Sequence, residues 1–169
     1  MASGGYRFTP LTAADLDLVA TWFEAPHVTE WWPGDGVGEI ARGLAEPGLD
    51  AYLVVFDGRP FAYLQVYDPF AEPDHPYRDQ PPGSRGVDLF IGEASMLGRG
   101  HGSALLREMS DRLLEAHHPR VLIDPDPTNG RAIRAYEKAG FRHLGLRSVE
   151  VPGEGAVAVA LMARDRKES

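Results

Sequence analysis

Residues 84–102 read SRGVDLFIGEASMLGRGHG, and they decide the fold that the sequence predicts. The first half is an apolar run typical of a β-strand, and the second half places Gly98, Gly100 and Gly102 in one turn. Ser103 then begins an amphipathic helical pattern. Glycines leave the N–H groups of such a turn unshielded at the positive end of the helix dipole, so the turn predicts a phosphate-binding site.

The turn differs from the two familiar glycine-rich phosphate loops. No Lys-Ser or Lys-Thr pair follows it, as the Walker sequence requires. Leu105 stands where a dinucleotide-binding GxGxxG sequence would have its third glycine. A phosphate site of another kind is therefore favoured, and a plain strand-to-helix turn is the alternative.

A second stretch, DPDPTNGRAIRAYEKAGF at residues 124–141, follows a short apolar strand pattern at 121–124. Asn129 is placed as a helix N-cap, and Gly140 is placed as the residue that ends the helix. Tyr136 lies between them on the apolar face of the predicted helix.

Together the two stretches resemble the GNAT superfamily of acyl-CoA-dependent N-acyltransferases. The QxxGxG pyrophosphate loop of that family is similar to residues 97–102, and its NxxAxxxYxxxGF segment is similar to residues 129–141. The second segment matches at every defining position, whereas Leu97 stands where the family usually has Gln or Arg. The resemblance implies an α/β (α+β) fold, with a central mixed, mostly antiparallel twisted sheet that is splayed at the acyl-CoA cleft and flanked by helices.

The same resemblance implies acetyl-CoA as the acyl donor. The N–H groups of the glycine turn would hold the pyrophosphate, and the strands at 89–92 and 121–124 would admit the pantetheine arm. The residues predicted to bind this cofactor are Ile91, Leu97, Gly98, Arg99, Gly100, His101, Gly102, Ser103 and Asn129.

Length and composition limit the class of protein. A chain of 169 residues can bury a sizeable core, so we expect a single domain over 1–169, with 164–169 as a frayed tail. There is no cysteine, which excludes disulfides and thiolate metal sites. The six histidines show no HxxxH or HxH pair, so no metal is expected.

Charge and targeting features narrow the partners. The formal net charge is −8, from 25 acidic and 17 basic residues, which argues against nucleic acid or an anionic membrane as a partner. The same charge suits a cationic small-molecule amine. The sequence shows no signal-peptide pattern and no apolar run long enough to span a membrane, so we expect a cytoplasmic location. A monomer and a homodimer both stay open as the oligomeric state.

Most of the remaining chain predicts scaffold. Thr12 begins a capping box before an amphipathic helix, and residues 51–67 alternate as a hairpin with a two-residue turn. A short helical pattern at 37–46, interrupted by Gly43, predicts a mobile cover rather than a part of the core. The segments 142–150 and 157–162 predict a terminal hairpin.

Two loops carry side chains suited to binding. Trp31 and Trp32 are adjacent in the loop 25–34, so one is expected to pack and the other to line a cleft, unless both are buried. The segment 68–82 contains five prolines and several acidic residues, which is typical of a loop. We interpret this loop as a rim of the substrate site. The alternative is an insertion that has no function.

Acyl transfer to an amine needs a base for the ammonium and an acid for the departing thiolate. Asp88 lies within an apolar strand, where a carboxylate is costly unless it is paired or used, so it is the candidate base. The alternatives are an ammonium anchor or a partner for Arg85 or the loop. The resemblance implies that Tyr136 faces the thioester sulfur and donates a proton there, whereas its plain alternative is a core tyrosine.

A narrower resemblance rests on four segments in order: HVTEWW at 27–32, RGVD at 85–88, the glycine turn and residues 124–141. This combination is similar to the aminoglycoside 6'-N-acetyltransferases, and it implies acetyl transfer to the 6'-amine of an aminoglycoside. The residues then expected to bind the substrate are Trp31, Trp32, Asp74, Tyr77, Asp88, Asp124 and Glu154.

Other interpretations stay open at this point. Siderophore-biosynthesis N-acyltransferases, which act on hydroxylated lysine, share the Trp-Trp loop and the GNAT core. A non-catalytic acyl-CoA-binding domain would keep the same fold. Asp124 also fits a cap on the helix that follows it. The loop 68–82 departs from related enzymes, with prolines and Tyr77 where these tend to have tryptophans.

Overall fold

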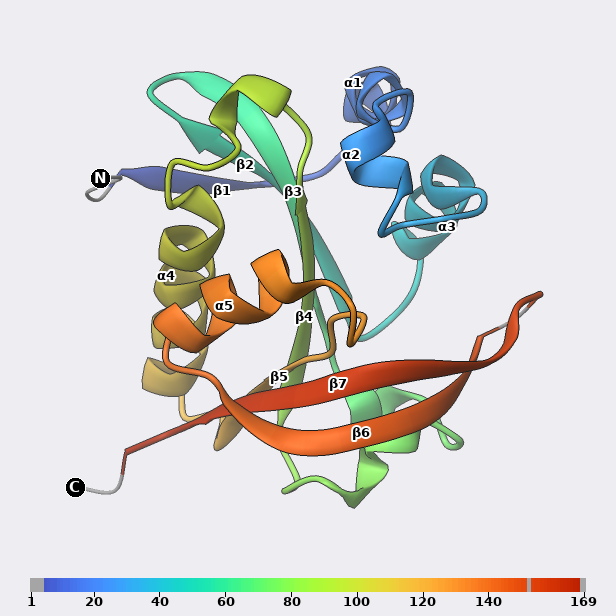
Figure 1. The fold of residues 1–169 in the computed structure, drawn as a ribbon, viewed down its shortest axis with the longest axis vertical. Helices are drawn as coiled ribbons and strands as arrows, with labels where there is room; N and C mark the ends of the chain where they lie inside the picture. Colours follow the sequence, from blue (N-terminus) through green and yellow to red (C-terminus); the bar gives the residue numbers. More distant parts are fainter. Residues whose placement is uncertain (1–4, 152, 168–169) are drawn as a thin grey trace. The chain divides into compact units, whose positions relative to one another are not determined.

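The computed structural model describes residues 5–151 and 153–167. Seven strands form one sheet in the order β1-β2-β3-β4-β5-β7-β6 (Figure 1). The chain divides into two compact units, the first made of Met1–Tyr67 with Asp88–Gly102 and the second of Asp68–Val87 with Ser103–Ser169. Strand β4 (Arg85–Ile91) therefore begins in the second unit and ends in the first.

The first unit contains three antiparallel strands, β1 (Tyr6–Pro10), β2 (Leu49–Phe56) and β3 (Arg59–Tyr67). The predicted hairpin is confirmed. Its two turn residues have positive φ angles, 52° at Asp57 and 76° at Gly58. Two positive φ values in a two-residue turn match the right-handed twist of the paired strands, which is why an Asp-Gly pair is effective here.

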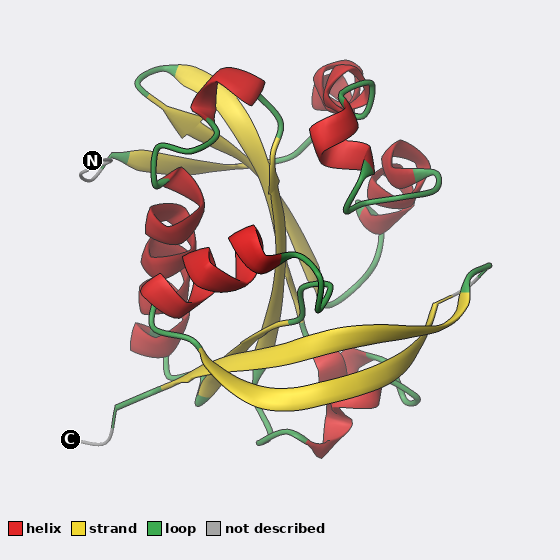
Figure 2. Ribbon diagram, viewed as in Figure 1, coloured by secondary structure: helices red, strands yellow, loops and turns green. Residues whose placement is uncertain are grey.

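The helices of the first unit are short (Figure 2). They are the 3-10 turn η1 (Ala13–Asp15), α1 (Leu16–Trp22), α2 (Pro26–Thr29), α3 (Gly36–Gly43) and the 3-10 turn η4 (Ala94–Met96). The predicted capping box at Thr12 is confirmed. The expected mobile cover is wrong for α3, because Ile40 is only 3% exposed and belongs to the hydrophobic core of this unit.

The second unit contains the parallel contact of the sheet and its long C-terminal hairpin. Strand β5 (Arg120–Ile123) pairs with the start of β4 at Arg85↔Val121 and Gly86↔Leu122. Strands β6 (Arg142–Val151) and β7 (Gly155–Asp165) form the expected antiparallel hairpin, and β7 also pairs with β5 (Figure 1).

The last strand corrects the expectation of a frayed tail from residue 164 onward. Arg164 and Asp165 belong to β7, and the guanidinium of Arg164 lies 2.6 Å from Asp111. Asp165 pairs with Arg120 at 2.6 Å and with Arg142 at 2.8 Å. These ion pairs hold residues 164–165 in the sheet, and the final residues, 168–169, lie outside the described part of the chain.

The two helices that follow the glycine turn and strand β5 lie at the predicted positions in the chain. Helix α4 (His101–Glu115) begins two residues before Ser103, immediately after the glycine turn, and α5 (Gly130–Lys138) has Asn129 as its N-cap. Gly140 follows α5 with a φ of 100°, as expected for a helix-ending glycine. Of the helices built from described residues, none has the length and apolarity needed to cross a membrane.

Candidate active site

The glycine turn in the first unit has the geometry of an anion site. Gly98 and Gly100 have φ values of 72° and 82°, a region that glycine enters without steric cost. Among the described residues, none accepts a hydrogen bond from the N–H groups of Gly98, Arg99 or Gly100. A Cβ built at Gly100 would meet nothing within 4 Å, so the turn is open on that side. These N–H groups, followed by the start of α4, fit a pyrophosphate.

The side chain of His101 fastens this turn to the sheet. His101 is 5% exposed, and its Nδ1 lies 2.7 Å from the phenol oxygen of Tyr6. The rings of Phe56 and Phe61 pack on the imidazole at centroid distances of 4.9 and 5.1 Å. Burial, together with the nearby charge of Arg99, lowers the pKa of His101. The imidazole is thus part of the core. Only the main chain of His101 can contact a bound cofactor.

Asp88 lies on β4, partly buried, beside the neighbouring strand β3. Its Oδ2 accepts a hydrogen bond of 2.9 Å from the side-chain amide of Gln65, and the Oε1 of Gln65 accepts one of 2.6 Å from the Tyr63 phenol. Burial raises the pKa of the Asp88 carboxyl, and the Gln65 hydrogen bond opposes that shift. Arg85, an expected alternative partner, instead pairs with Asp68 at 3.3 Å.

The tryptophan pair divides as expected between packing and exposure. Trp32 packs edge-on against Phe23, Tyr63 and Phe90, at centroid distances of 6.3, 6.0 and 5.2 Å. Trp31 is 41% exposed. Trp31 therefore has free surface for a ligand, whereas Trp32 is a wall of the aromatic cluster around Tyr63.

The end of β4 is held by two side chains of the N-terminal helices. The Nε2 of His27 donates to the carbonyl oxygen of Ile91 at 3.0 Å, and the indole N–H of Trp22 donates to Glu93 at 2.5 Å. Trp22 also packs so closely that a Cβ at Gly92 would lie 2.1 Å from its ring. Ile91, a predicted cofactor residue, thus sits on a strand end fixed by buried contacts.

In the second unit, Asn129 and Tyr136 occupy opposite ends of α5. The side-chain oxygen of Asn129 accepts from the N–H of Ala132 at 3.2 Å, so this side chain serves as the helix cap. Tyr136 is 8% exposed. The residue as a whole is therefore shielded from solvent, which is compatible with a core tyrosine and with a proton donor to the sulfur.

Asp124 lies just past the end of β5 and is held by Tyr77. The Tyr77 phenol donates to its Oδ2 at 2.5 Å. Tyr77 is 1% exposed, which leaves almost no surface for direct contact with a ligand. This burial does not fit the expected direct contact of Tyr77 with the substrate. Asn129, and not Asp124, is the cap of α5.

Arg147 on β6 holds the loop segment that carries Tyr77. Arg147 pairs with Asp79 at 2.7 Å, donates to the carbonyl oxygen of Pro76 at 3.2 Å, and places its guanidinium 5.7 Å from the Tyr77 ring centre. The hydrogen bond and charge of Arg147 lower the pKa of Asp79. Arg147 thereby holds the loop at Asp79 and Pro76.

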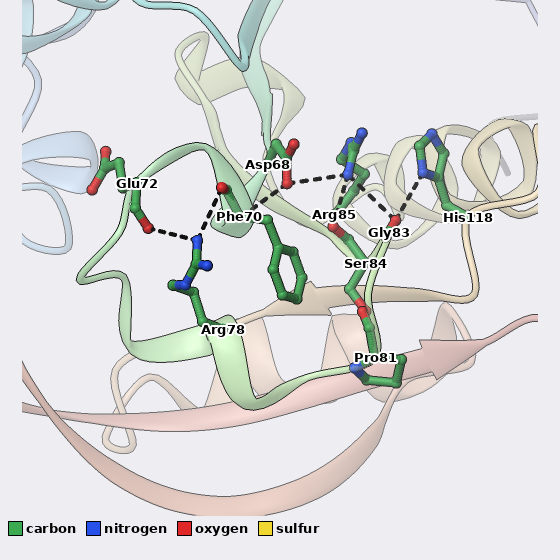
Figure 3. A network of polar contacts seen from close by, with 9 residues as sticks. All are labelled: Asp68, Phe70, Glu72, Arg78, Pro81, Gly83, Ser84, Arg85 and His118. Atoms are coloured by element: carbon green, nitrogen blue, oxygen red, sulfur yellow. Dashed lines mark hydrogen bonds and ion pairs between the residues drawn. The ribbon is translucent and has the colours of Figure 1, made fainter.

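Figure 3 shows a second set of bonds within the same loop. The segment predicted as a loop contains two 3-10 turns, η2 (Pro69–Ala71) and η3 (Pro76–Asp79). Arg78 joins them by donating to the carbonyl oxygens of Phe70 and Glu72 at 3.0 and 3.2 Å. At the end of the loop, His118 donates to the carbonyl oxygen of Gly83 at 2.9 Å. The loop is thus a built structure with a defined shape.

The two remaining acidic candidates are on exposed turns. Asp74 lies between η2 and η3, and Glu154 lies in the turn between β6 and β7. Both can meet a cation in solvent, where ion pairs contribute little. Among the described residues, no group of three or more His, Cys, Asp or Glu is arranged to hold a metal ion.

Comparison with known proteins assigns this arrangement to a family. The acetyltransferase (GNAT) domain family matches residues 12–149, which include the glycine turn, Asp88 and Tyr136. The chain belongs to the GNAT acetyltransferases. It is therefore an N-acetyltransferase with the mixed sheet of that family.

Individual GNAT relatives cover most of the chain. The aminoglycoside N(6')-acetyltransferase type 1 of Klebsiella pneumoniae is 34% identical over 158 residues, 87% of this chain and 78% of that protein. The solved structure of AAC(6')-Ib in complex with coenzyme A and kanamycin has a TM-score of 0.82 at 30% identity, covering 96% of this chain and 95% of that one. Lysine N-acyltransferase MbtK of Mycolicibacterium paratuberculosis is 30% identical over 138 residues, 78% of this chain and 62% of that protein.

Sequence reasoning missed three side chains that have clear structural roles. Tyr63 and Gln65 looked like ordinary alternating residues of a strand, although a polar Gln between apolar neighbours was a usable signal. Arg147 lies 68 residues from Asp79 in sequence, and nothing local predicts that pair.

Proposed function

We propose that this GNAT enzyme transfers the acetyl group of acetyl-CoA to an amine of a polycationic small molecule, and that its preferred acceptor is the 6'-amine of an aminoglycoside. The observation that carries the proposal is the similarity, over nearly the whole chain, to an acetyltransferase solved with coenzyme A and kanamycin. Buried or partly buried carboxylates at Asp88 and Asp124 support it, because each suits an ammonium group.

The proposed mechanism gives Asp88 the first proton transfer. An aminoglycoside amine is largely protonated near neutral pH, and only the free amine has the electron pair that attacks an acyl carbon. Asp88 accepts the ammonium proton, for which its raised pKa makes it a better base than an exposed carboxylate. The amine nitrogen then bonds to the acetyl carbon, the bond from that carbon to sulfur breaks, and the nitrogen releases its second excess proton to solvent.

Two further parts of the chain have proposed roles in the same reaction. Acetyl-CoA, when bound, supplies the activated acetyl group. The N–H groups of Gly98, Arg99 and Gly100 hold its pyrophosphate, and Arg99 adds a positive charge in solvent. Tyr136 donates the proton that the departing sulfur takes up, so that CoA leaves as a thiol and Tyr136 is restored from solvent.

Several carboxylates bind the polycationic substrate. Asp124, held by Tyr77, binds a second ammonium group, and Asp74 and Glu154 contribute attraction at longer range. Trp31 offers exposed aromatic surface for a sugar ring. The net charge of −8 favours the approach of a cation at low salt.

A second candidate function is acylation of a lysine or hydroxylysine side chain, which the similarity to lysine N-acyltransferase MbtK favours. Such a substrate carries fewer ammonium groups, so it would use Asp88 and would not need an ion pair with Asp124. The proposal also includes a cytoplasmic location, where acetyl-CoA is available, and no nucleic acid or membrane partner.

A substrate panel tests the proposal. Release of the CoA thiol is followed with acetyl-CoA and each of kanamycin, lysine, Nε-hydroxylysine and a simple monoamine, and NMR of the kanamycin product locates the acetyl group. We expect the highest kcat/KM for kanamycin, with acetylation at the 6'-nitrogen. A higher kcat/KM for hydroxylysine would favour the second function. Binding of acetyl-CoA without turnover of any amine would indicate a non-catalytic domain.

A further inference from the structure

A chain of side-chain hydrogen bonds leads from the core of the first unit to Asp88. Tyr63 and Gln65 lie on the same face of β3, two residues apart, and Asp88 lies on β4. The Tyr63 phenol donates to Gln65 at 2.6 Å, and Gln65 donates to Asp88 at 2.9 Å. Tyr63 is fully buried, with its ring stacked on Phe90 at 5.5 Å. The Tyr63 end of this series of hydrogen bonds is therefore rigid.

The buried phenol decides which way the Gln65 amide points. A buried O–H needs an acceptor, and leaving it unpaired costs about 1–3 kcal/mol. Within the described residues, the acceptor for the Tyr63 O–H is the Oε1 of Gln65. When Oε1 is used in this way, the NH₂ group of the amide must face Asp88. If the amide were flipped, Oε1 would face a carboxylate oxygen and the Tyr63 O–H would lose its partner.

The fixed amide acts on the charge of Asp88. An N–H donor stabilises a carboxylate more than a neutral carboxylic acid, because the acceptor carries a full negative charge. Burial acts in the opposite direction. Among the described residues, Asp88 forms no ion pair, so the Gln65 amide takes the place that a cation would otherwise fill.

Tyr63 is the titratable group that interacts with Asp88 from the adjacent strand. Burial, and then the negative charge of Asp88, raise the pKa of the Tyr63 phenol. The phenol therefore keeps its proton to a higher pH than an exposed tyrosine does. Trp32 and Phe90, which pack on Tyr63, carry no charge.

We propose that Tyr63 and Gln65 are positioning residues for Asp88: Tyr63 fixes the orientation of the Gln65 amide, and Gln65 keeps Asp88 ionised and ready to accept a proton. In the reaction, Asp88 takes the proton of the incoming ammonium while its bond to Gln65 is kept, because a neutral carboxyl still has an acceptor oxygen. The part of this inference that concerns turnover rests on the proposed function, whereas the part that concerns the charge of Asp88 does not.

The first test measures Asp88 itself in the protein without acetyl-CoA. The carboxyl ¹³C chemical shift of Asp88 is titrated by NMR in the parent, Gln65→Leu and Tyr63→Phe proteins, with Asp88→Asn used to assign the signal. We expect the midpoint to move upward in Gln65→Leu and upward by less in Tyr63→Phe. Tyr63 makes no hydrogen bond to Asp88 itself. A shift of the midpoint in Tyr63→Phe therefore reports the lost orientation of the Gln65 amide, and not a change of polarity directly beside the carboxylate.

A matched control is Gln80→Leu, which removes another glutamine with a side-chain hydrogen bond; Gln80 is buried in the second unit and accepts from Arg120 at 3.0 Å. The control should leave the Asp88 midpoint at the parent value. An unchanged or lower midpoint in both Gln65→Leu and Tyr63→Phe would overturn the proposal, as would an equal upward shift in the control. If Gln65→Leu does not fold, the direction of the Tyr63→Phe shift decides.

The second test measures turnover and shows whether this arrangement serves the reaction. The acid limb of the kcat/KM profile with kanamycin should move to higher pH in Gln65→Leu, with kcat/KM about tenfold below the parent on that limb and a smaller loss above it. A loss of equal size at every pH would mean that Gln65 has only a structural role. Absence of turnover by the parent would instead refute the proposed function and leave the NMR result valid.

Discussion

The phenol of Tyr77 donates a hydrogen bond of 2.5 Å to the carboxylate of Asp124, although the two residues lie 47 positions apart in the chain. Tyr77 is buried to 1% exposure, and Arg147 lies over its ring while pairing with Asp79. One carboxylate oxygen of Asp124 is thereby fixed by a donor that cannot easily move. Asp124 is thus oriented before any substrate arrives.

Removal of the Tyr77 phenol should weaken amine binding more than it slows the chemical step. In Tyr77→Phe the ring still fills its buried place, whereas Asp124 loses the hydrogen bond that the phenol donates. We expect KM for kanamycin to rise about tenfold with kcat changed less than threefold, the size of one hydrogen bond to a charged group. Steady-state kinetics with saturating acetyl-CoA measure both, and Tyr52→Phe on β2 is the matched control. An unchanged KM would remove Tyr77 from the binding of the amine.

Gly100→Val should abolish acetyl-CoA binding. A β-branched residue at a φ of 82° is strained, and its side chain would project on the open side of the turn, where the anion is expected. Gly58→Val is a closely matched control, since Gly58 has a φ of 76°, no atom within 4 Å of a built Cβ, and a place in the β2–β3 turn. Both variants should lose similar thermal stability, but calorimetry should detect acetyl-CoA binding in the control alone. Equal affinity in the two would refute the phosphate role of the turn.

Local chemistry explains which parts of the fold were predictable. The Asp57-Gly58 turn, the Thr12 capping box, the Asn129 cap and the glycine turn each depend on residues within a few positions of one another. Sequence patterns record such short-range requirements directly. The interpretation of α3 failed because Gly43 weakened the helical pattern, while the burial of Ile40 depends on a distant partner surface.

The chemistry around the two aspartates was only half predictable. A carboxylate inside an apolar strand marked Asp88 as unusual, because an unused charge there is costly. Its partner Gln65 lies 23 positions away, and the pairing depends on strand register, which a single sequence does not show. The same reason hid the contact of Arg147 with the loop that carries Tyr77.

Tyr136→Phe should lower kcat far more than it weakens acetyl-CoA binding. The ring is 8% exposed and its packing survives the change, so the difference reports the phenol O–H alone. Loss of a general acid typically costs about 10²–10⁴ in rate. Turnover is measured by thiol release, and acetyl-CoA affinity by calorimetry on the same preparations. Parental kcat in the variant would leave Tyr136 with only a packing role.

Stability should fall in acid partly through Asp165. Burial raises the pKa of this carboxyl, but the hydrogen bonds and charges of Arg120 and Arg142 outweigh it, so the net pKa is lowered. The folded protein then binds fewer protons than the unfolded chain, and this stabilisation is present above the ordinary pKa of an aspartate and is lost as pH falls through the lowered value. Urea unfolding of Asp165→Asn should show lower stability at pH 7 and a shallower decline between pH 5 and 3. The exposed control Asp17→Asn should decline as the parent does.

Asp88→Asn and Asp124→Asn should affect the reaction in different ways. If Asp88 accepts the proton, its loss removes the base, so kcat should fall by about 10²-fold or more and the acid limb of the pH profile should disappear. Asp124 only binds an ammonium group, so its loss should raise KM for kanamycin with a smaller change in kcat. Rates measured over a range of pH and kanamycin concentrations, with acetyl-CoA saturating, separate the two effects.

Salt provides an independent check on the role of Asp124. A partly buried carboxylate facing an ammonium is screened less than a surface pair, which contributes only about 0–1 kcal/mol, but the long-range attraction of an acidic chain for a polycation is screened. KM for kanamycin should therefore rise with salt in the parent, and the extra KM caused by Asp124→Asn should persist at high salt, because it comes from a close contact. If the difference vanishes at high salt, Asp124 acts only at a distance. If neither aspartate matters and kanamycin reacts no faster than a monoamine, acylation of a lysine-type substrate becomes the better explanation.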